Sequence, residues 1–271
     1  MDDHEPGRPA IDTSVPHSAR RYNYWLGGKD NFAVDRQSGD EIERLFPTVR
    51  VMAVANRRLL QRVVRFLTAD AGVRQFLDIG TGLPTADNTH EVAQRIAPES
   101  HILYVDNDPL VLVHARALLT STDAGETAYL EADLRDPGSI VRHPQLRATL
   151  DLSQPVGLLL FAVLHFVPGQ GEARGIVEQL VDVLPSGSYL VASHATQDFS
   201  PPELVAAYRK LLDNGRADVW PRDRDEFTAL FDGLELVGPG VVPAGEWRPD
   251  PGEPLPVRQD VGLWAAVARK P

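Results

Sequence analysis

The feature of this sequence that most constrains its fold is a regular alternation between short apolar segments and segments of helical period. Glycine or proline marks many of the boundaries between them. Such alternation is typical of a mostly parallel β-sheet with helices on both faces. Seven strands are expected, the last two suited to an antiparallel edge pair: 74–79, 101–105, 127–132, 157–164, 188–193, 234–237 and 263–268.

The chain ahead of the first strand has a different character. Residues 1–16 are rich in Asp, Pro and Gly, which predicts a flexible leader. Residues 17–70 contain three helical patterns, which we interpret as an N-terminal helical cap or lid. Residues 71–271 would form the α/β core, in one integrated domain with the cap. Helices are expected at 18–26, 35–45, 49–67, 85–96 and 137–150, among others.

Composition narrows the range of partners and compartments. The chain has 38 Asp and Glu against 27 Lys and Arg, a formal net charge of −11, which argues against a nucleic-acid partner. It has no cysteine, which removes disulfides, thiolate nucleophiles and Cys-ligated zinc and fits a cytoplasmic protein. No apolar run approaches the roughly 20 residues of a membrane-spanning helix, so no membrane association is expected.

The end of the first predicted strand carries the most informative motif. In open α/β sheets, ligands bind outside the carboxyl ends of the strands. Here Asp78 is followed by Gly80, Thr81 and Gly82, a tight turn that lets a ligand approach bare backbone. A carboxylate beside this loop suits the ammonium and sulfonium centres of S-adenosylmethionine, whereas it would oppose a pyrophosphate. Thr85 stands where a dinucleotide fingerprint requires Gly or Ala, which also disfavours NAD.

The next strands end in further polar residues. Asp106, with Asn107 beside it, closes the second strand, where a carboxylate can accept hydrogen bonds from both ribose hydroxyls. Asp133 follows the third strand and could accept from the exocyclic amine of adenine, with the Leu134 N–H facing a ring nitrogen. A helix cap is the equal alternative for Asp133. Ala162 lies where the fourth strand runs into the pocket.

Acidic residues at the ends of three successive strands resemble the class I S-adenosylmethionine-dependent methyltransferases. More narrowly, residues 19–32, with the sequence ARRYNYWLGGKDNF, resemble the bacterial S-adenosyl methyltransferase, or DUF574, family. The resemblance implies a Rossmann-like class I fold and S-adenosyl-L-methionine as cofactor. One departure is Asn23, where family members more often carry Asp. If that position contacts the ligand's positive charge, the contact is weakened here.

Transfer of a methyl group from a sulfonium requires positioning and desolvation more than a catalytic side chain. A general base matters only if the acceptor must lose a proton. His165 and His194 follow the fourth and fifth strands and are the candidate bases. The alternative for each is a hydrogen-bonded structural histidine. No closely spaced His/Asp/Glu trio completes a metal site, so no metal is expected.

The N-terminal motif supplies candidate lid and substrate residues. We interpret Tyr22, Tyr24, Lys29 and Asn31 as covering the methionine end of the cofactor and forming one wall of the acceptor pocket. The alternative is an aromatic helix packed on the sheet. The segment 199–220 could shape the acceptor site as well, although packing is the more common fate of its aromatic residues.

The leading functional hypothesis is methyl transfer from S-adenosylmethionine to a small molecule with O or N as acceptor atom. A noncatalytic S-adenosylmethionine-binding or interaction protein would use the same glycine loop and Asp106. An NAD-dependent oxidoreductase is weakened by Thr85 and by the absence of a Tyr-x-x-x-Lys pair. The sequence indicates neither the identity of the acceptor nor the oligomeric state.

Overall fold

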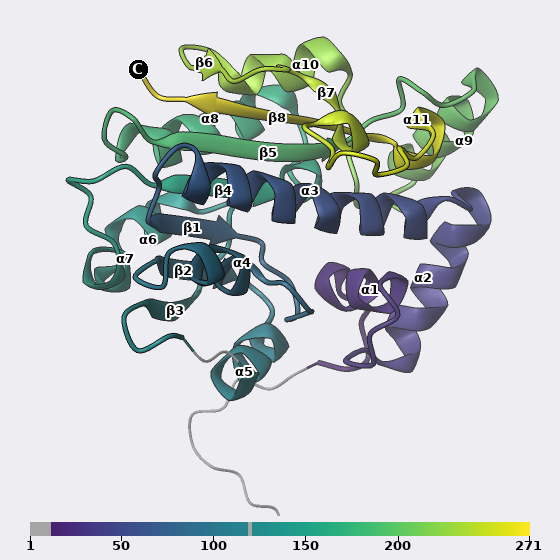
Figure 1. The fold of residues 1–271 in the computed structure, drawn as a ribbon. Helices are drawn as coiled ribbons and strands as arrows, with labels where there is room; N and C mark the ends of the chain where they lie inside the picture. The colour runs from purple at the N-terminus through teal and green to yellow at the C-terminus, as the bar shows by residue number, and fades with distance from the viewer. Residues whose placement is uncertain (1–11, 119–120) are drawn as a thin grey trace, which may run out of the picture.

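A single twisted sheet of eight strands organises the protein (Figure 1). The structure is a computed structural model that describes residues 12–118 and 121–271. The strand order is β3-β2-β1-β4-β5-β8-β6, with β7 also paired to β8, and the first five strands run parallel. The strands are β1 Gln75–Ile79, β2 His101–Asp106, β3 Glu126–Glu131, β4 Gly157–Phe161, β5 Tyr189–Ala195, β6 Glu235–Leu236, β7 Val242–Pro243 and β8 Leu263–Arg269.

The predicted mostly parallel α/β sheet is confirmed, but the predicted count of seven strands is wrong by one. The additional strand, β7, has only two residues, and it pairs antiparallel with Ala265 and Trp264 of β8. It lies in a Pro/Gly-rich segment, where two residues are too few for a period to be visible. The antiparallel pairing expected at the end of the chain involves β8, which lies between β5 and β6.

Helices surround the sheet, and two of them differ from expectation. The helix expected at 85–96 begins only at Thr89, because Asn88 caps it, with its own N–H donating to Glu91 at 2.7 Å. The helix expected at 137–150 is broken at Pro144, which has no N–H and disfavours helical geometry in the residue before it. The helices are α1 Ser18–Trp25, α2 Ala33–Leu45, α3 Val49–Ala69, α4 Thr89–Ile96, α5 Pro109–Leu118, α6 Pro137–Arg142, α7 Pro144–Thr149, α8 Gln170–Asp182, α9 Pro202–Asp213, α10 Arg224–Thr228 and α11 Arg258–Val261.

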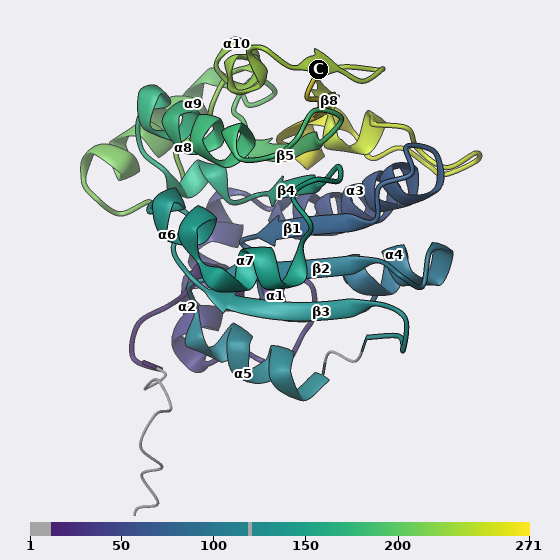
Figure 2. The ribbon, with the colours of Figure 1, turned by 90° about the vertical axis from the view of Figure 1, so that its left-hand side faces the viewer.

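The core consists of two apolar layers, one on each face of the sheet. Helix α3 runs along one face (Figure 2), in contact with β4 and β8, and it buries Leu59, Val63 and Leu67. Helix α8 lies on the opposite face and buries Ile176 and Leu180. These faces provide most of the burial that stabilises the fold, at about 25 cal/mol per Å² of apolar area. Helix α3 therefore contributes to the core.

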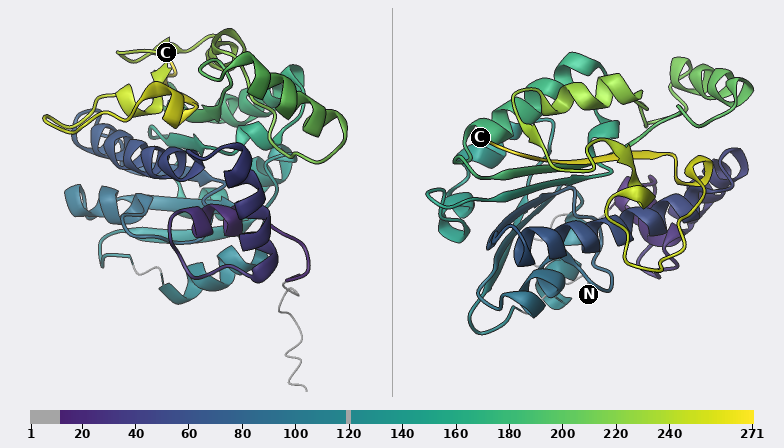
Figure 3. Two further views of the ribbon diagram at one scale, coloured as in Figure 1. Left: turned by 90° about the vertical axis from the view of Figure 1, so that its right-hand side faces the viewer. Right: turned by 45° about the horizontal axis from the view of Figure 1, so that its top comes forward.

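Helices α1 and α2 lie beside the carboxyl ends of the parallel strands (Figures 1 and 3). Of the predicted cap, residues 17–70, this edge holds α1 and α2, which we refer to as the cap below. Most of the predicted leader, residues 1–11, lies outside the described residues. Its remaining part is attached to the cap, because the carbonyl oxygen of Asp12 accepts from Arg20 Nη1 at 2.7 Å. None of the helices described here combines the length and the apolar character that a bilayer crossing requires.

Candidate cofactor and acceptor site

The glycine loop at the end of β1 combines close packing with open space. Gly80 has φ = 75°, and a Cβ there would lie 2.4 Å from Val163 Cγ2, so a side chain is excluded. Gly82 also has positive φ (66°), but no atom lies within 4 Å of its hypothetical Cβ. Between them, the hydroxyl of Thr81 is buried without a hydrogen-bond partner. The loop therefore offers a cradle that a Cβ would fill and a polar atom that a ligand could satisfy.

Asp106 closes β2 and joins the two loops at this edge. Its Oδ2 accepts from the N–H of Gly82 at 2.8 Å, and its Oδ1 accepts from the N–H of Asp108 at 2.9 Å. Burial raises the pKa of this carboxyl, and the two N–H donors act in the opposite direction. Each carboxylate oxygen has two lone-pair sites, so acceptor capacity remains for two hydroxyl groups.

Asp78 lies within β1, one residue before the strand ends. The hydroxyl of Thr89, at the start of α4, donates to its Oδ2 at 2.6 Å. Burial raises the pKa of Asp78 from its ordinary value of 3.8 to about 6. The side chain is only 4% exposed, and no ion pair neutralises it among the described residues. A cation placed beside Asp78 would therefore stabilise its ionised form.

The end of β3 is more exposed than the ends of β1 and β2. The carboxylate of Asp133 is bonded by Arg135 Nε, Nη2 and N–H, which holds its pKa at about 2. Asn107 Nδ2 donates to the same carboxylate at 3.3 Å and connects the β2 and β3 ends. Leu134 is buried in the core layer. The alternative that Asp133 caps the next helix is wrong, because the N-cap residue of α6 is Asp136.

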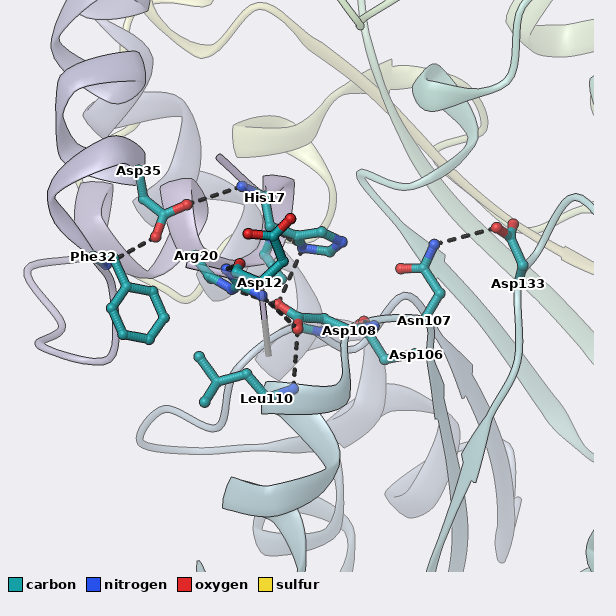
Figure 4. Close-up of polar contacts among 12 residues, drawn as sticks. Asp12, His17, Arg20, Phe32, Asp35, Asp106, Asn107, Asp108, Leu110 and Asp133 are labelled. Carbon is teal, nitrogen blue, oxygen red and sulfur yellow. Dashed lines mark hydrogen bonds and ion pairs between the residues drawn. The ribbon is translucent and has the colours of Figure 1, made fainter. Parts of the chain in front are cut away.

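An ion pair joins the cap to the β2 loop, and the sequence reading did not find it (Figure 4). Arg20 Nε and Nη2 donate to the two oxygens of Asp108 at 2.9 and 3.0 Å, and both side chains are at least 96% buried. Asp108 also caps α5 by accepting from the N–H of Leu110 at 3.0 Å. His17 Nδ1 lies 3.2 Å from the same carboxylate. The cap is therefore fixed directly to the loop that carries Asp106.

The loop after α1 is organised by Asn23. Its Oδ1 accepts from the Asp30 N–H at 3.1 Å and from Asn31 Nδ2 at 2.9 Å, so Asn23 holds the chain reversal at Gly28. Asn31 is thereby a structural part of the turn. Lys29 lies at the exposed tip of the same turn. The acceptor role of Asn23 is one that an aspartate would share.

The two predicted lid tyrosines have different surroundings. Tyr22 donates from its hydroxyl to the Ala53 carbonyl and accepts from Asn56 Nδ2, both at 3.0 Å, so it points into α3. The hydroxyl of Tyr24 donates to Asp40 at 2.7 Å, and its ring lies under the Arg50 guanidinium. Tyr24 is thus packed between α2 and α3, and its part in the wall of the acceptor pocket stays a prediction.

A chain of hydrogen bonds continues from Tyr22 to the end of β4. Asn56 Oδ1 accepts from the Ser193 hydroxyl at 2.6 Å, and Ser193 Oγ accepts from the Ala162 N–H at 2.9 Å. Ala162 has φ = 50°, an uncommon conformation for a residue with a Cβ. Such strain persists where the surroundings fix it and is frequent at functional sites. The cap and the β4 end are therefore held in one relative position.

The two predicted histidine bases differ sharply. His194 is fully buried, its Nδ1 lies 2.8 Å from the Ala195 carbonyl, and its Nε2 lies 2.6 Å from Arg222 Nη1. Burial lowers its pKa well below the usual range. Both ring nitrogens have partners, so His194 is a structural residue, and the prediction that it accepts a substrate proton is not supported. His165 is 7% exposed, and its Nδ1 accepts from the Ala195 N–H at 3.4 Å.

Arg222 is a second buried cation that sequence reasoning missed. It donates to the carbonyl oxygens of Leu164, Val167 and Gly169 and to Gln170 Oε1, over distances of 2.7 to 3.2 Å. These bonds fix the turn after β4, and with it His165. Nothing in the local pattern around Arg222 distinguishes it from a surface arginine, because its partners are backbone carbonyls far away in sequence.

The charges around His165 come from α1 and from the segment between α9 and α10. Burial lowers the pKa of His165 to about 4, while Asp218 acts to raise it and Arg222 and Arg21 to lower it. Arg21, on α1, forms an ion pair with Asp218 from the segment after α9. Among the described residues, no cluster of three or more potential ligands is arranged to hold a metal ion.

The strand order 3-2-1-4-5, the glycine loop after β1 and the carboxylate ending β2 together define a Rossmann-like protein of the class I methyltransferase fold. The sequence profile of the S-adenosyl methyltransferase family matches residues 4–271, and the chain belongs to this family. Its cofactor is S-adenosyl-L-methionine.

Individual relatives agree with this family. The crystal structure of a DUF574 family protein from Streptomyces avermitilis MA-4680 is 47% identical, covers 97% of this chain and all of its own, and has a TM-score of 0.89. A structure named as a putative methyltransferase from Thermobifida fusca YX is 40% identical, covers 97% of each chain and has a TM-score of 0.87.

A more distant sequence relative comes from Mycobacterium marinum (strain ATCC BAA-535 / M). It is named a putative S-adenosyl-L-methionine-dependent methyltransferase and is 28% identical over 156 residues, which are 55% of this chain. The match spans only 46% of the length of this curated relative.

Proposed function

We propose that this protein transfers the methyl group of S-adenosyl-L-methionine to an oxygen or nitrogen atom of a small molecule. The observation that carries the proposal is the glycine loop, where the space beside Gly82 and the unpartnered Thr81 hydroxyl adjoin the carboxylate of Asp106. When bound, the cofactor supplies an activated methyl group on a sulfonium centre.

Each strand end has a proposed part in holding the cofactor. Asp106 accepts from the ribose hydroxyls with its remaining lone pairs, and Asn107 borders the same edge. Gly80, Thr81 and Gly82 provide the backbone surface beneath the methionine portion. Asp78 offers its buried carboxylate to the ammonium group.

The remaining predicted residues have proposed parts around this site. Asp133 and the Leu134 N–H border the adenine, and the exposed side of Asp133 remains open to the amine. Ala162 brings the β4 backbone to the methyl end. Tyr22, Lys29 and Asn31 belong to a cap that covers the cofactor, in which Arg20 provides the attachment. We further propose that the protein works in the cytoplasm, in keeping with its lack of cysteine.

A noncatalytic S-adenosylmethionine-binding protein is the second candidate. It is favoured by the state of the two histidines, since His194 has both nitrogens bonded and the pKa of His165 is about 4. Neither is a strong base near neutral pH. Catalysis therefore requires an acceptor that needs little help in losing a proton, whereas a binding protein requires none.

Calorimetry and methyl transfer test the proposal together. S-adenosylmethionine should bind the wild-type protein, and Asp106→Asn should weaken binding about tenfold or more, since hydrogen bonds to a charged group contribute about 1.5–3 kcal/mol. The matched control is Asp182→Asn on the exposed face of α8, which should bind normally. Equal affinity of the Asp106 variant, or binding of NAD in place of S-adenosylmethionine, would refute the assignment.

Methyl transfer distinguishes the enzyme from the binding protein. Wild-type protein incubated with a methyl-labelled donor and fractionated small-molecule extract should produce a labelled product, and Asp106→Asn should produce less. Cofactor binding without labelling in any fraction would favour the noncatalytic alternative.

A further inference from the structure

A buried guanidinium follows Arg20 on α1, the helix that is joined to the β2 loop. The Arg21 side chain is 9% exposed, its Nη1 donates to Ser38 Oγ at 3.4 Å, and its Nη2 pairs with Asp218. Its Nε is buried and has no hydrogen-bond partner. One N–H donor of this guanidinium therefore lacks an acceptor. A buried donor without an acceptor destabilises the folded state by about 1–3 kcal/mol.

The partner of Arg21 is easily displaced. Asp218 belongs to the segment between α9 and α10, and its side chain is 51% exposed. The ion pair thus joins the cap to an exposed segment rather than to the core. A second carboxylate that bonded both Nε and Nη2 would satisfy the guanidinium better than Asp218 does, because a planar fork matches a carboxylate in a bidentate manner.

Arg21 and its partner also lie near the turn after β4. The charges of Arg21 and Asp218 both act on His165, which follows β4. They act as well on Tyr208 of α9, whose ring packs edge-on against Phe46 at 5.3 Å. The backbone N–H of Trp220, two residues after Asp218, donates to the His165 carbonyl at 2.7 Å. The segment that pairs with Arg21 therefore also contacts the turn after β4, and the half-buried Tyr208 and Trp220 belong to α9 and to this segment.

We propose that Arg21 binds the carboxylate of the methyl acceptor, and that Asp218 occupies the position of this carboxylate in the absence of acceptor. The acceptor is then a small aromatic or apolar carboxylic acid that is methylated on a carboxylate oxygen. This inference rests on the proposed methyltransferase function and names its substrate class.

The chemistry of the surrounding groups agrees with such an acceptor. Both nitrogens of His194 are bonded, burial keeps the pKa of His165 at about 4, and the Tyr208 hydroxyl donates to the Val219 carbonyl at 2.8 Å. No strong base therefore faces this region among the described residues. A carboxylate needs none, because it is already ionised at neutral pH.

The methyl transfer requires no transfer of a proton. A lone pair of the carboxylate oxygen forms the new C–O bond as the C–S bond of the sulfonium donor breaks, and the sulfur keeps the bonding pair. The acceptor loses its negative charge and becomes a methyl ester, and the donor loses its positive charge and becomes a thioether.

Ligand binding tests the proposal without any turnover. Wild-type protein saturated with S-adenosylhomocysteine is titrated with acetate, benzoate and indole-3-acetate, each compared with its neutral amide by ligand-observed NMR and calorimetry. At least one acid should bind about tenfold or more tightly than its amide, as expected for a charge-assisted bidentate pair. Equal affinities for every acid and amide pair would overturn the proposal.

Variants of the two partners should act in opposite directions. Arg21→Gln should abolish the preference for acids, and Arg21→Lys should retain only part of it. Asp218→Asn should increase affinity for the acid several-fold, because it removes the competing carboxylate at an exposed position. Arg216→Gln, an exposed arginine of the same segment, is the matched control and should change nothing. Weaker acid binding in Asp218→Asn would overturn the displacement argument even if Arg21→Gln failed to fold.

The labelled product provides an independent outcome. Methyl esters release methanol in mild base, whereas N-methyl and ether products do not. Base-labile label supports the carboxylate, and base-stable label overturns it while leaving methyltransferase function intact. Failure of S-adenosylhomocysteine itself to bind would instead refute the proposed function.

Discussion

Asp78 makes an unusual prediction, in which one substitution stabilises the protein and weakens its ligand binding. Its carboxyl has a pKa of about 6 in the folded chain, against an ordinary value of 3.8, because it is buried. A tenfold change in an ionisation constant corresponds to about 1.4 kcal/mol, so keeping this group ionised at pH 7 costs the folded state about 3 kcal/mol. Asp78→Asn removes that cost and retains an oxygen that can accept from Thr89.

The pH dependence of stability follows from the same values. Because the folded carboxyl binds its proton more tightly than the unfolded one, the contribution of Asp78 to unfolding free energy falls as pH rises from about 4 to about 6 and is constant above that range. Chemical denaturation should therefore show Asp78→Asn more stable than wild type at pH 7 by up to about 3 kcal/mol, and the difference should shrink towards pH 4.

Cofactor binding should change in the opposite direction. If the ionised carboxylate receives the ammonium group, affinity for S-adenosylhomocysteine should fall about tenfold from pH 8 to pH 5, because the carboxyl titrates near pH 6. Asp78→Asn should bind weakly and without this pH dependence. 5′-Methylthioadenosine, which lacks the amino-acid portion, is the control ligand. A destabilised Asp78→Asn, or an affinity that is flat in pH for the wild type, would refute the reasoning.

Three further predictions concern the loop, the cap and the buried histidine. Gly80→Ala should lower the free energy of unfolding by about 2–4 kcal/mol, because its Cβ meets Val163. Gly82→Ala should lower the free energy of unfolding by only about 1–2 kcal/mol and should mainly weaken cofactor binding. Chemical denaturation measures the first effect and calorimetry the second. Arg20→Met should lower the free energy of unfolding by about 3–5 kcal/mol, because it leaves the buried Asp108 without Arg20. The double variant with Asp108→Asn should recover part of that loss, and no recovery would contradict the prediction. His194→Gln should lose about 1–3 kcal/mol of stability but leave the pH profile of methyl transfer unchanged, and a shifted profile would restore His194 as a base.

The sequence was informative wherever a local rule determines the structure. The strand ends with Asp78, Gly80 and Asp106 could be located because period, glycine spacing and strand polarity are all local features. The start of α4 was missed because Asn88 competes with Thr85 as a cap, and only the folded loop decides between them.

Side-chain directions could not be read from the sequence. Tyr22 and Tyr24 lie two residues apart on α1, yet one bonds to α3 and the other to Asp40 on α2. Arg20 and Arg222 have partners 88 and 28 to 58 residues away, so nothing near them in the chain marks them as buried. Such contacts depend on how elements pack, which a single sequence does not specify.

The central claim is that the carboxyl edge of β1 and β2 holds the adenosyl cofactor, and a crystal structure with S-adenosylhomocysteine tests it most directly. We expect the ligand to lie over Gly80–Gly82 beneath the cap, with both ribose hydroxyls within hydrogen-bond distance of the Asp106 carboxylate and the ammonium group beside Asp78. A ligand bound elsewhere, or this edge filled by the protein's own side chains at saturating ligand, would contradict it.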